Sequence, residues 1–127
     1  MKIGILSKED YIQRTIAIAK GQYKPAEDEP KVWFESMKSL AQVLSNENQQ
    51  LLKIIIHHKP GSIAEIEELT HRKKSNLSRT LKTLERYGIV ELMKDKGKVI
   101  PKVKFTKFKV EFSLEKKLSN LADLVIF

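Results

Sequence analysis

Apolar residues recur at helical intervals near the start of the chain. Ile12, Ile16 and Ala19 are separated by four and three residues, which predicts a helix over residues 8–20. The stretch that follows, residues 22–31, contains two prolines around an acidic cluster and has no periodicity. This composition is typical of a linker or an extended arm.

The next apolar positions continue the helical period. Phe34, Met37 and Leu44 belong to two overlapping apolar stripes, which predict a helix over residues 31–44. Ser45 has the character of a helix N-cap, and the isoleucine-rich segment after it ends at Pro60-Gly61. Its length and its polar beginning favour a helix that is buried on more than one side rather than a strand.

Two shorter helices are predicted after the Pro-Gly stop. Ser62 and Glu65 have the spacing of a capping box and begin a helix that ends near Thr70. After a polar turn, residues 75–87 form a second amphipathic segment, which ends at the C-cap residue Gly88. Its apolar stripe consists of three leucines at i, i+4 and i+7: Leu77, Leu81 and Leu84.

Beyond Gly88 the apolar period changes from helical to alternating. Residues 89–93 and 99–105 read as two strands, and residues 95–98 between them read as a turn. The apolar register shifts near Thr106, so a bend is expected before any continuation of the hairpin over residues 108–112. A last amphipathic helix is predicted over residues 113–127.

These elements predict an α+β fold that is mainly α. Three helices, the last two joined by a tight turn, followed by a basic β-hairpin, are typical of a winged helix-turn-helix, here with additional N- and C-terminal helices. The predicted domains are an N-terminal helix with its Pro-rich acidic arm over 1–31, the winged helix-turn-helix over 32–112, and the C-terminal helix over 113–127.

The distribution of charge indicates an acidic partner. The 127-residue chain has 24 Lys and Arg against 16 Asp and Glu, a net charge of +8. The segment after His71 up to and including Glu111 holds 13 basic and 4 acidic residues, hence +9, and leaves −1 for the rest. A basic excess confined to one contiguous segment is expected of a surface that binds a polyanion.

The polar face of the predicted 75–87 helix suits DNA recognition, because it lies opposite the leucines and carries donors and no carboxylate. Arg79 is the predicted base-reading residue, since its planar fork can bind guanine O6 and N7 together. Lys73, Lys74, Lys82 and Arg86 suit phosphates, while Ser75, Asn76, Ser78 and Thr83 can donate to bases or phosphates. In the basic wing over residues 94–104, Lys96 and Lys98 at the tip are expected to meet an adjacent backbone or minor groove.

The sequence gives little support for a disulfide, a metal or cofactor site, or a catalytic site. The absence of cysteine excludes disulfides and thiolate metal ligands. His57 and His58 are neighbours on a helix and point about 100° apart, so we expect no metal site and no cofactor. The dense carboxylate clusters lie in the arm and on a helix surface, and no Gly-rich phosphate loop is present, so we do not expect an enzyme.

The chain is also expected to be cytoplasmic. Its longest apolar runs, residues 54–56 and 124–127, are far shorter than the ~20 residues that cross a bilayer. The N-terminal apolar stretch is interrupted too early by charged residues to be a signal peptide. No membrane association is therefore predicted.

Two sequence stretches resemble known regulators. The run SIAEI from Ser62, followed by SNLSRTLKTLERYGIVEL over residues 75–92, resembles the helix-turn-helix of MarR-like winged-helix regulators. The wider stretch over residues 32–110 resembles a family of small prokaryotic DNA-binding proteins that are often encoded beside a toxin-like protein. This resemblance implies a transcriptional repressor, which can regulate its own promoter, or the antitoxin of a toxin and antitoxin pair.

Two functional hypotheses therefore remain open. The first is a sequence-specific regulator that binds double-stranded DNA, as a homodimer on a palindromic site. The predicted helix from Phe34 to Leu44 and the C-terminal helix are the candidates for the dimer contact. The second is an interaction module that binds and neutralises a small toxin-like protein through the arm over residues 23–31, with DNA binding secondary.

Overall fold

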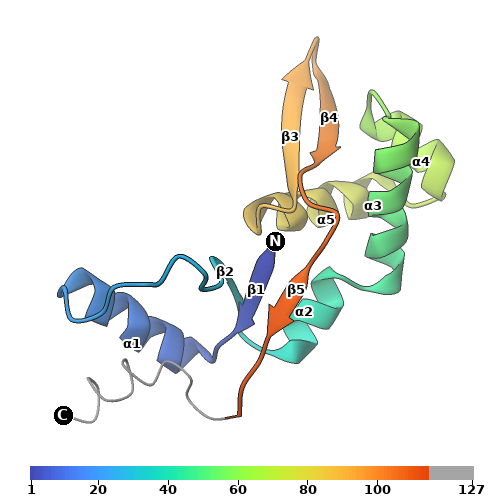
Figure 1. Cartoon of the computed structure of the whole chain (residues 1–127). Helices are drawn as coiled ribbons and strands as arrows, with labels where there is room; N and C mark the ends of the chain where they lie inside the picture. Colours follow the sequence, from blue (N-terminus) through green and yellow to red (C-terminus); the bar gives the residue numbers. More distant parts are fainter. Residues whose placement is uncertain (115–127) are drawn as a thin grey trace. The chain divides into compact units, whose positions relative to one another are not determined.

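Three short strands form a parallel sheet near the two ends of the described chain (Figure 1). The computed structural model describes residues 1–114, and in it β1 (Lys2–Ile5) lies between β2 (Val32–Phe34) and β5 (Lys109–Glu111). Ile3, at the centre of the sheet, is fully buried. The sequence pattern did not predict this sheet, because each strand is only three or four residues long and its partners are distant in the chain.

The described chain divides into two compact units. One unit combines Met1–Leu40 with the described residues from Phe108 onward, and the other is Ala41–Lys107. This division differs from the predicted domain boundaries after residues 31 and 112. The physical reason is the pairing of β1 with both β2 and β5, which joins the N-terminal segment to residues that follow the winged motif.

The helix α1 (Lys8–Ala19) begins where it was predicted to begin. The Ser7 side chain caps it by accepting a hydrogen bond from the Asp10 backbone N–H at 3.2 Å. Its buried residues are Arg14 and Ala17, whereas Ile12 and Ile16, which indicated the helix, are each 47% exposed. The apolar stripe of α1 therefore faces away from the described part of its own unit.

A glycine lets an aromatic ring lie directly on the central strand. Gly4 in β1 pairs in parallel register with Trp33 in β2. A Cβ atom at position 4 would come within 2.3 Å of Trp33 Cζ3, so the close approach requires glycine. The guanidinium of Arg14 in α1 lies 4.9 Å from the centroid of the Trp33 ring, which places α1 over this side of the sheet.

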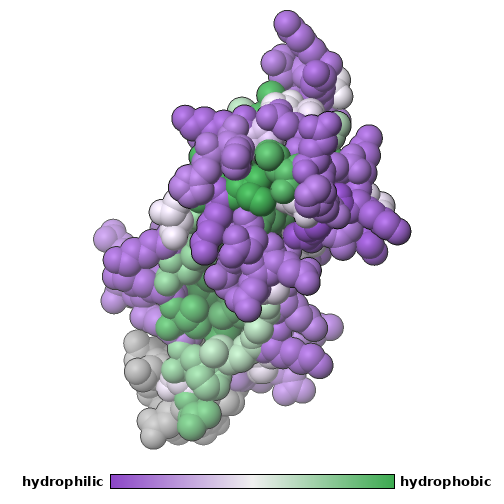
Figure 2. All heavy atoms as spheres, turned by 90° about the vertical axis from the view of Figure 1, so that its right-hand side faces the viewer, coloured by the Kyte–Doolittle hydropathy of each residue, from purple (hydrophilic) through white to green (hydrophobic). Residues whose placement is uncertain are grey.

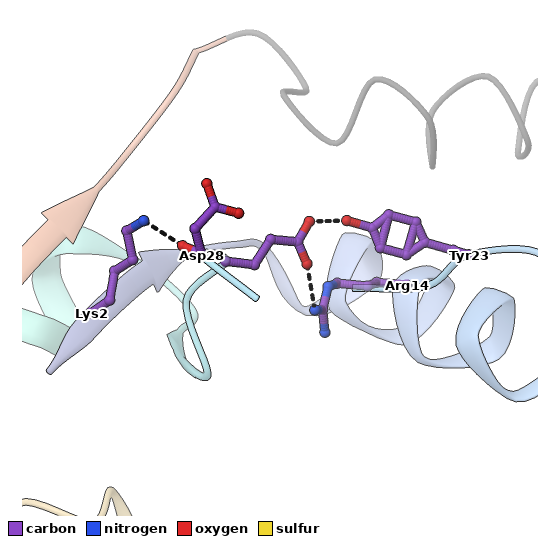
Figure 3. Close-up of polar contacts among 5 residues, drawn as sticks. Lys2, Arg14, Tyr23 and Asp28 are labelled. Carbon is purple, nitrogen blue, oxygen red and sulfur yellow. Dashed lines mark hydrogen bonds and ion pairs between the residues drawn. The ribbon is translucent and has the colours of Figure 1, made fainter. Parts of the chain in front are cut away.

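Side chains of α1 and β1 bind the Pro-rich acidic arm, which belongs to the same compact unit as these two elements (Figure 3). Arg14 Nη2 donates to Glu29 Oε2 at 3.2 Å, and the Tyr23 hydroxyl donates to the other carboxylate oxygen of Glu29. Lys2 Nζ donates to the backbone carbonyl of Asp28. The prediction that residues 22–31 form neither helix nor strand is confirmed, but side-chain contacts fix this segment.

The predicted helix over residues 31–44 is wrong in its first half. Val32–Phe34 pairs with β1, and Phe34 is buried in the core of the unit. Only α2 (Met37–Val43) is helical, and its start is stabilised by the Ser39 backbone N–H, which donates to Ser36 Oγ at 3.0 Å. The apolar run that continues from strand to helix conceals this change of structure in the sequence.

Three helices form the body of the second unit: α3 (Asn46–His58), α4 (Ile63–Thr70) and α5 (Lys74–Arg86). Ser45 and Ser62 cap α3 and α4 as predicted. The helices share a buried core with the start of the hairpin, formed by Leu51, Leu52, Ile55, Ile66, Leu77, Leu81, Leu84, Ile89 and Val90.

The hairpin consists of β3 (Val90–Asp95) and β4 (Lys98–Val103), which pair antiparallel. Lys96 and Gly97 form the tight turn between them, with φ angles of 50° and 78° as a primed hairpin turn requires. The chain bends at Thr106 as expected. The hairpin does not continue over residues 108–112, because the next strand, β5, pairs with β1.

The predicted fold class is confirmed: the described chain is α+β, mainly helical, with a winged helix-turn-helix from α3 to β4 and an additional N-terminal helix. The C-terminal helix predicted over residues 113–127 lies outside the described residues from residue 115 on. Among residues 1–114, no helix has the length and apolar character that crossing a membrane requires.

Candidate nucleic-acid interface

One face of α5 is buried and the opposite face is basic. Leu77, Leu81 and Leu84 are at most 1% exposed, and α5 packs against α4 and β3 through this side. Arg79 and Lys82 lie on the other side and are exposed. The pattern of leucines in the sequence therefore determines which side chains of α5 point away from the protein.

The structure leaves most of the predicted DNA-binding side chains accessible. Ser78 and Thr83 are half-buried, and the Thr83 hydroxyl donates to the Arg79 backbone carbonyl at 3.0 Å, so its capacity to donate is used within the helix. The remaining predicted contact residues are all exposed: Lys73, Lys74, Ser75, Asn76, Arg79, Lys82, Arg86, Lys96 and Lys98.

The beginning of α5 presents both side-chain and backbone donors. Lys73 occupies the N-cap position and makes no side-chain capping bond. The first intrahelical hydrogen bond from this end is donated by the Leu77 N–H to the Lys73 carbonyl at 2.9 Å. The amides of the first turn therefore have no intrahelical acceptor, and this end of a helix favours phosphate.

Asn76 is less free than the sequence indicated. Its side-chain oxygen accepts two hydrogen bonds from Arg72, from Nε at 2.9 Å and from Nη2 at 2.6 Å. Only the amide group of Asn76 remains to donate to a base or phosphate. Sequence reasoning counted Arg72 only as a charge, and no spacing rule marks its partners.

The wing carries its charge at the tip of the hairpin. Figure 2 shows the projecting tip as entirely hydrophilic on the face it displays. Lys98 lies directly opposite Asp95 in the antiparallel register, whereas Lys96 occupies the turn and has no opposite residue. Because a cross-strand carboxylate offsets a lysine, Lys96 is the less compensated of the two cations.

The unit that contains α5 and the wing holds nearly all of the net charge. Ala41–Lys107 has 14 Lys and Arg against 7 Asp and Glu, hence +7 of the total of +8. Within residues 1–114, the ion pairs are Lys2–Glu111 and Arg14–Glu29, both in the other unit. The exposed cations of α5 and of the wing tip thus form no ion pair among the described residues.

Arg86 differs from the other cations of α5. Its guanidinium lies 5.3 Å from the centroid of the Tyr87 ring, at the C-terminal end of the helix. A cation–π contact leaves the edge of the guanidinium free to donate. Arg86 is therefore held in one direction and can still contact a phosphate.

One family model matches the part of the chain that contains α5 and the wing. The model of the HVO_A0114 family matches residues 43–110, which is more than half of the chain. Among proteins of curated function, none matches this sequence. A similar solved structure, entitled the predicted DNA-binding transcriptional regulator from E. coli, has 15% identity and a TM-score of 0.42, with 91% of this chain and 95% of that chain covered.

Proposed function

Because this chain belongs to the HVO_A0114 family and folds its matched region as a winged helix-turn-helix, we propose that it is a sequence-specific regulator that binds double-stranded DNA. The observation that carries the proposal is the division of α5 into a buried leucine face and an exposed cationic face. A helix of this kind beside a basic wing fits the major groove of DNA.

In the proposed complex, α5 lies in the major groove. Arg79 forms the bidentate contact with a guanine, and Lys73, Lys74 and Lys82 bind phosphates that fix the register. Arg86 and the two wing-tip lysines, Lys96 and Lys98, bind further phosphates of the adjacent backbone. These roles assign sequence reading to one residue and positioning to the others.

We further propose that the protein represses transcription by occupying DNA, including its own promoter. The support is the resemblance of residues 75–92 to MarR-like regulators. A protein that acts by occupancy needs no catalytic group, which agrees with the absence of a catalytic motif in the sequence. Reporter expression from its own promoter, with and without the protein, tests the sign of regulation.

The change Arg79→Ala should cost about 1–3 kcal/mol at one base position of the preferred site and relax the preference there. The site is first selected from random duplexes with the wild-type protein. Binding of Arg79→Ala is then measured on this site and on its single-base variants. Lys53→Ala is the matched control, because Lys53 is an exposed cation on α3 that has no proposed contact with DNA.

Full affinity and full specificity in the double variant Arg79→Ala/Lys82→Ala would overturn the assignment of α5 to the major groove. If Lys53→Ala lost as much affinity for the selected site as Arg79→Ala, binding would depend on general electrostatics and not on a recognition helix.

We also propose that the chain acts as a homodimer through the outer face of α1. Tyr11, Ile12 and Ile16 are 45–47% exposed, an unusual fraction for three large apolar residues on one short helix. The previously considered helix around Phe34–Leu44 is less suitable, because Phe34 and Leu40 are buried. A homodimer suits a palindromic site, whose two half-sites lie about 34 Å apart and each take one recognition helix.

The double change Ile12→Glu/Ile16→Glu is expected to convert the dimer to a monomer and to weaken binding to a two-half-site duplex more than to a half-site. Light scattering after size exclusion measures the mass, and Gln13→Glu on the exposed side of α1 is the control. A wild-type monomer, or a dimer that persists in the double variant, would contradict the proposal. Capture of a small toxin-like protein by the same face would instead favour the antitoxin alternative.

The antitoxin alternative is weakened, because part of the segment that it assigns to partner binding is bonded within the protein. It assigned partner binding to the arm over residues 23–31, yet Tyr23 and Glu29 in that arm are bonded within their own unit. Only the exposed part, residues 24–28, remains available to a partner.

A further inference from the structure

Arg72 connects three parts of the winged motif with its side chain. It lies in the turn between α4 and α5, and its Nη1 donates to Asn48 Oδ1 on α3 at 3.1 Å. Its Nε and Nη2 donate to Asn76 Oδ1, and Nη2 also donates to Thr80 Oγ1 at 3.0 Å. One guanidinium thus joins α3 to the first two turns of α5.

The donors of Arg72 are almost fully used inside the protein. Four of the five guanidinium N–H groups are accounted for by these bonds. The Arg72 backbone N–H also donates, to Thr70 Oγ1 at 3.2 Å, and the residue is half-buried. Unlike Lys73 and Lys74, which follow it, Arg72 has little capacity left for a phosphate.

The acceptor on α3 is itself fixed in place. Asn48 Nδ2 donates to the Val43 carbonyl at the end of α2 at 2.9 Å, and the Asn48 backbone N–H donates to Ser45 Oγ at 3.2 Å. Arg72 is therefore bonded to a side chain that cannot easily follow a movement of α5.

The hydrogen bonds from Arg72 restrict the rotation of α5 about its own axis. Leucine packing on one side of a helix is non-directional and tolerates small rotations. Asn76 and Thr80 are four residues apart and so lie one above the other on one side of α5, beside the face that carries Arg79. Two directional bonds at these positions hold the direction in which Arg79 projects.

We propose that Arg72 is a positioning residue that sets the orientation of α5 for sequence reading without contacting DNA. This inference rests on the proposed DNA-binding function and deepens it. Base reading by a bidentate arginine requires placement to within about 10–20°, so small rotations of α5 affect specific binding more than phosphate binding. The planar guanidinium is required, because an ammonium has no rigid fork to join three acceptors.

The test compares wild type with Arg72→Lys, which keeps the charge and removes the fork. Affinity is measured on the selected site and on unrelated duplex over a range of salt concentrations. Affinity for the selected site should fall about tenfold, the size of one lost charge-assisted hydrogen bond, while affinity for unrelated duplex and the salt slope stay unchanged. A loss of specificity at constant salt slope is a result that general unfolding does not produce.

The change Asn48→Ala tests the same inference with a residue on α3, outside the recognition helix. It removes the α3 acceptor, and its effect on specificity should have the same direction as that of Arg72→Lys. Gln49→Ala is the matched control, because Gln49 Nε2 donates to the Leu44 carbonyl at 2.7 Å in the same helix cap and is not bonded to Arg72. Thermal unfolding of each variant shows whether the fold is retained.

Three outcomes separate the possibilities. Unchanged specificity in Arg72→Lys overturns the inference and leaves the proposed function intact. Weaker binding to all duplexes in Arg72→Ala, with a salt slope lower by about one, identifies Arg72 as a phosphate contact and also overturns it. Wild-type protein that binds no duplex overturns the proposed function, and the inference with it.

Discussion

Raising the salt concentration from 50 to 200 mM should weaken DNA binding about 10³-fold for each chain bound. Six cations are assigned to phosphates: Lys73, Lys74, Lys82, Arg86, Lys96 and Lys98. They are exposed and form no ion pair within residues 1–114. Each phosphate contact contributes roughly −0.9 to the slope of log K against log salt, so a slope near −5 is expected.

The two lysines of the wing tip provide an internal control for this slope. Lys96→Ala should reduce its magnitude by about 0.9. Lys98→Ala should reduce it by less, since Asp95 lies directly opposite Lys98 in the hairpin. Fluorescence anisotropy with a labelled duplex measures both, and a wild-type slope near zero would rule out the proposed phosphate contacts.

Glu29→Ala is expected to lower the free energy of unfolding by about 3 kcal/mol. Arg14 is only 8% exposed, and Glu29 is its carboxylate partner at 3.2 Å. Arg14 Nε is already buried without a hydrogen-bond partner among the described residues. Removal of the carboxylate would therefore leave an almost uncompensated charge beside Trp33 and would free the Tyr23 hydroxyl.

Chemical denaturation followed by circular dichroism measures this change. The control is Glu27→Ala, which alters an exposed carboxylate of the same arm and should have little effect. The double variant Arg14→Met/Glu29→Leu should recover most of the stability, because it replaces the buried pair with apolar side chains. A Glu29→Ala variant as stable as wild type would show that the pair does not hold the arm.

Most of the winged motif could be predicted from the sequence, because its signals are local. Ser45 and Ser62 mark helix starts, and Gly88, with φ of 76°, marks the end of α5. The leucine stripe of α5 identifies its buried face, and the basic residues are clustered near it in the chain. Candidate contact residues follow directly from these two patterns, although their roles on DNA stay predictions.

The parallel sheet could not be predicted in the same way. Strands of three or four residues are too short to show an alternating pattern, and Val32–Phe34 merges with the apolar period of α2. Parallel pairing of β1 with β5 joins residues more than one hundred positions apart. Nothing in the local sequence of either strand specifies such a partner.

The sequence by itself determined where α1, α3, α4 and α5 begin and end, which face of α5 is apolar and where the positive charge is concentrated, since each depends on neighbours within a few turns. Only the tertiary structure decided that the apolar stripe of α1 faces outward, that Glu29 neutralises the buried Arg14, and that Arg72 bonds to Asn48 and Asn76. The physical reason is that burial and side-chain hydrogen bonds depend on which distant residues meet, and residue spacing encodes only local periodicity.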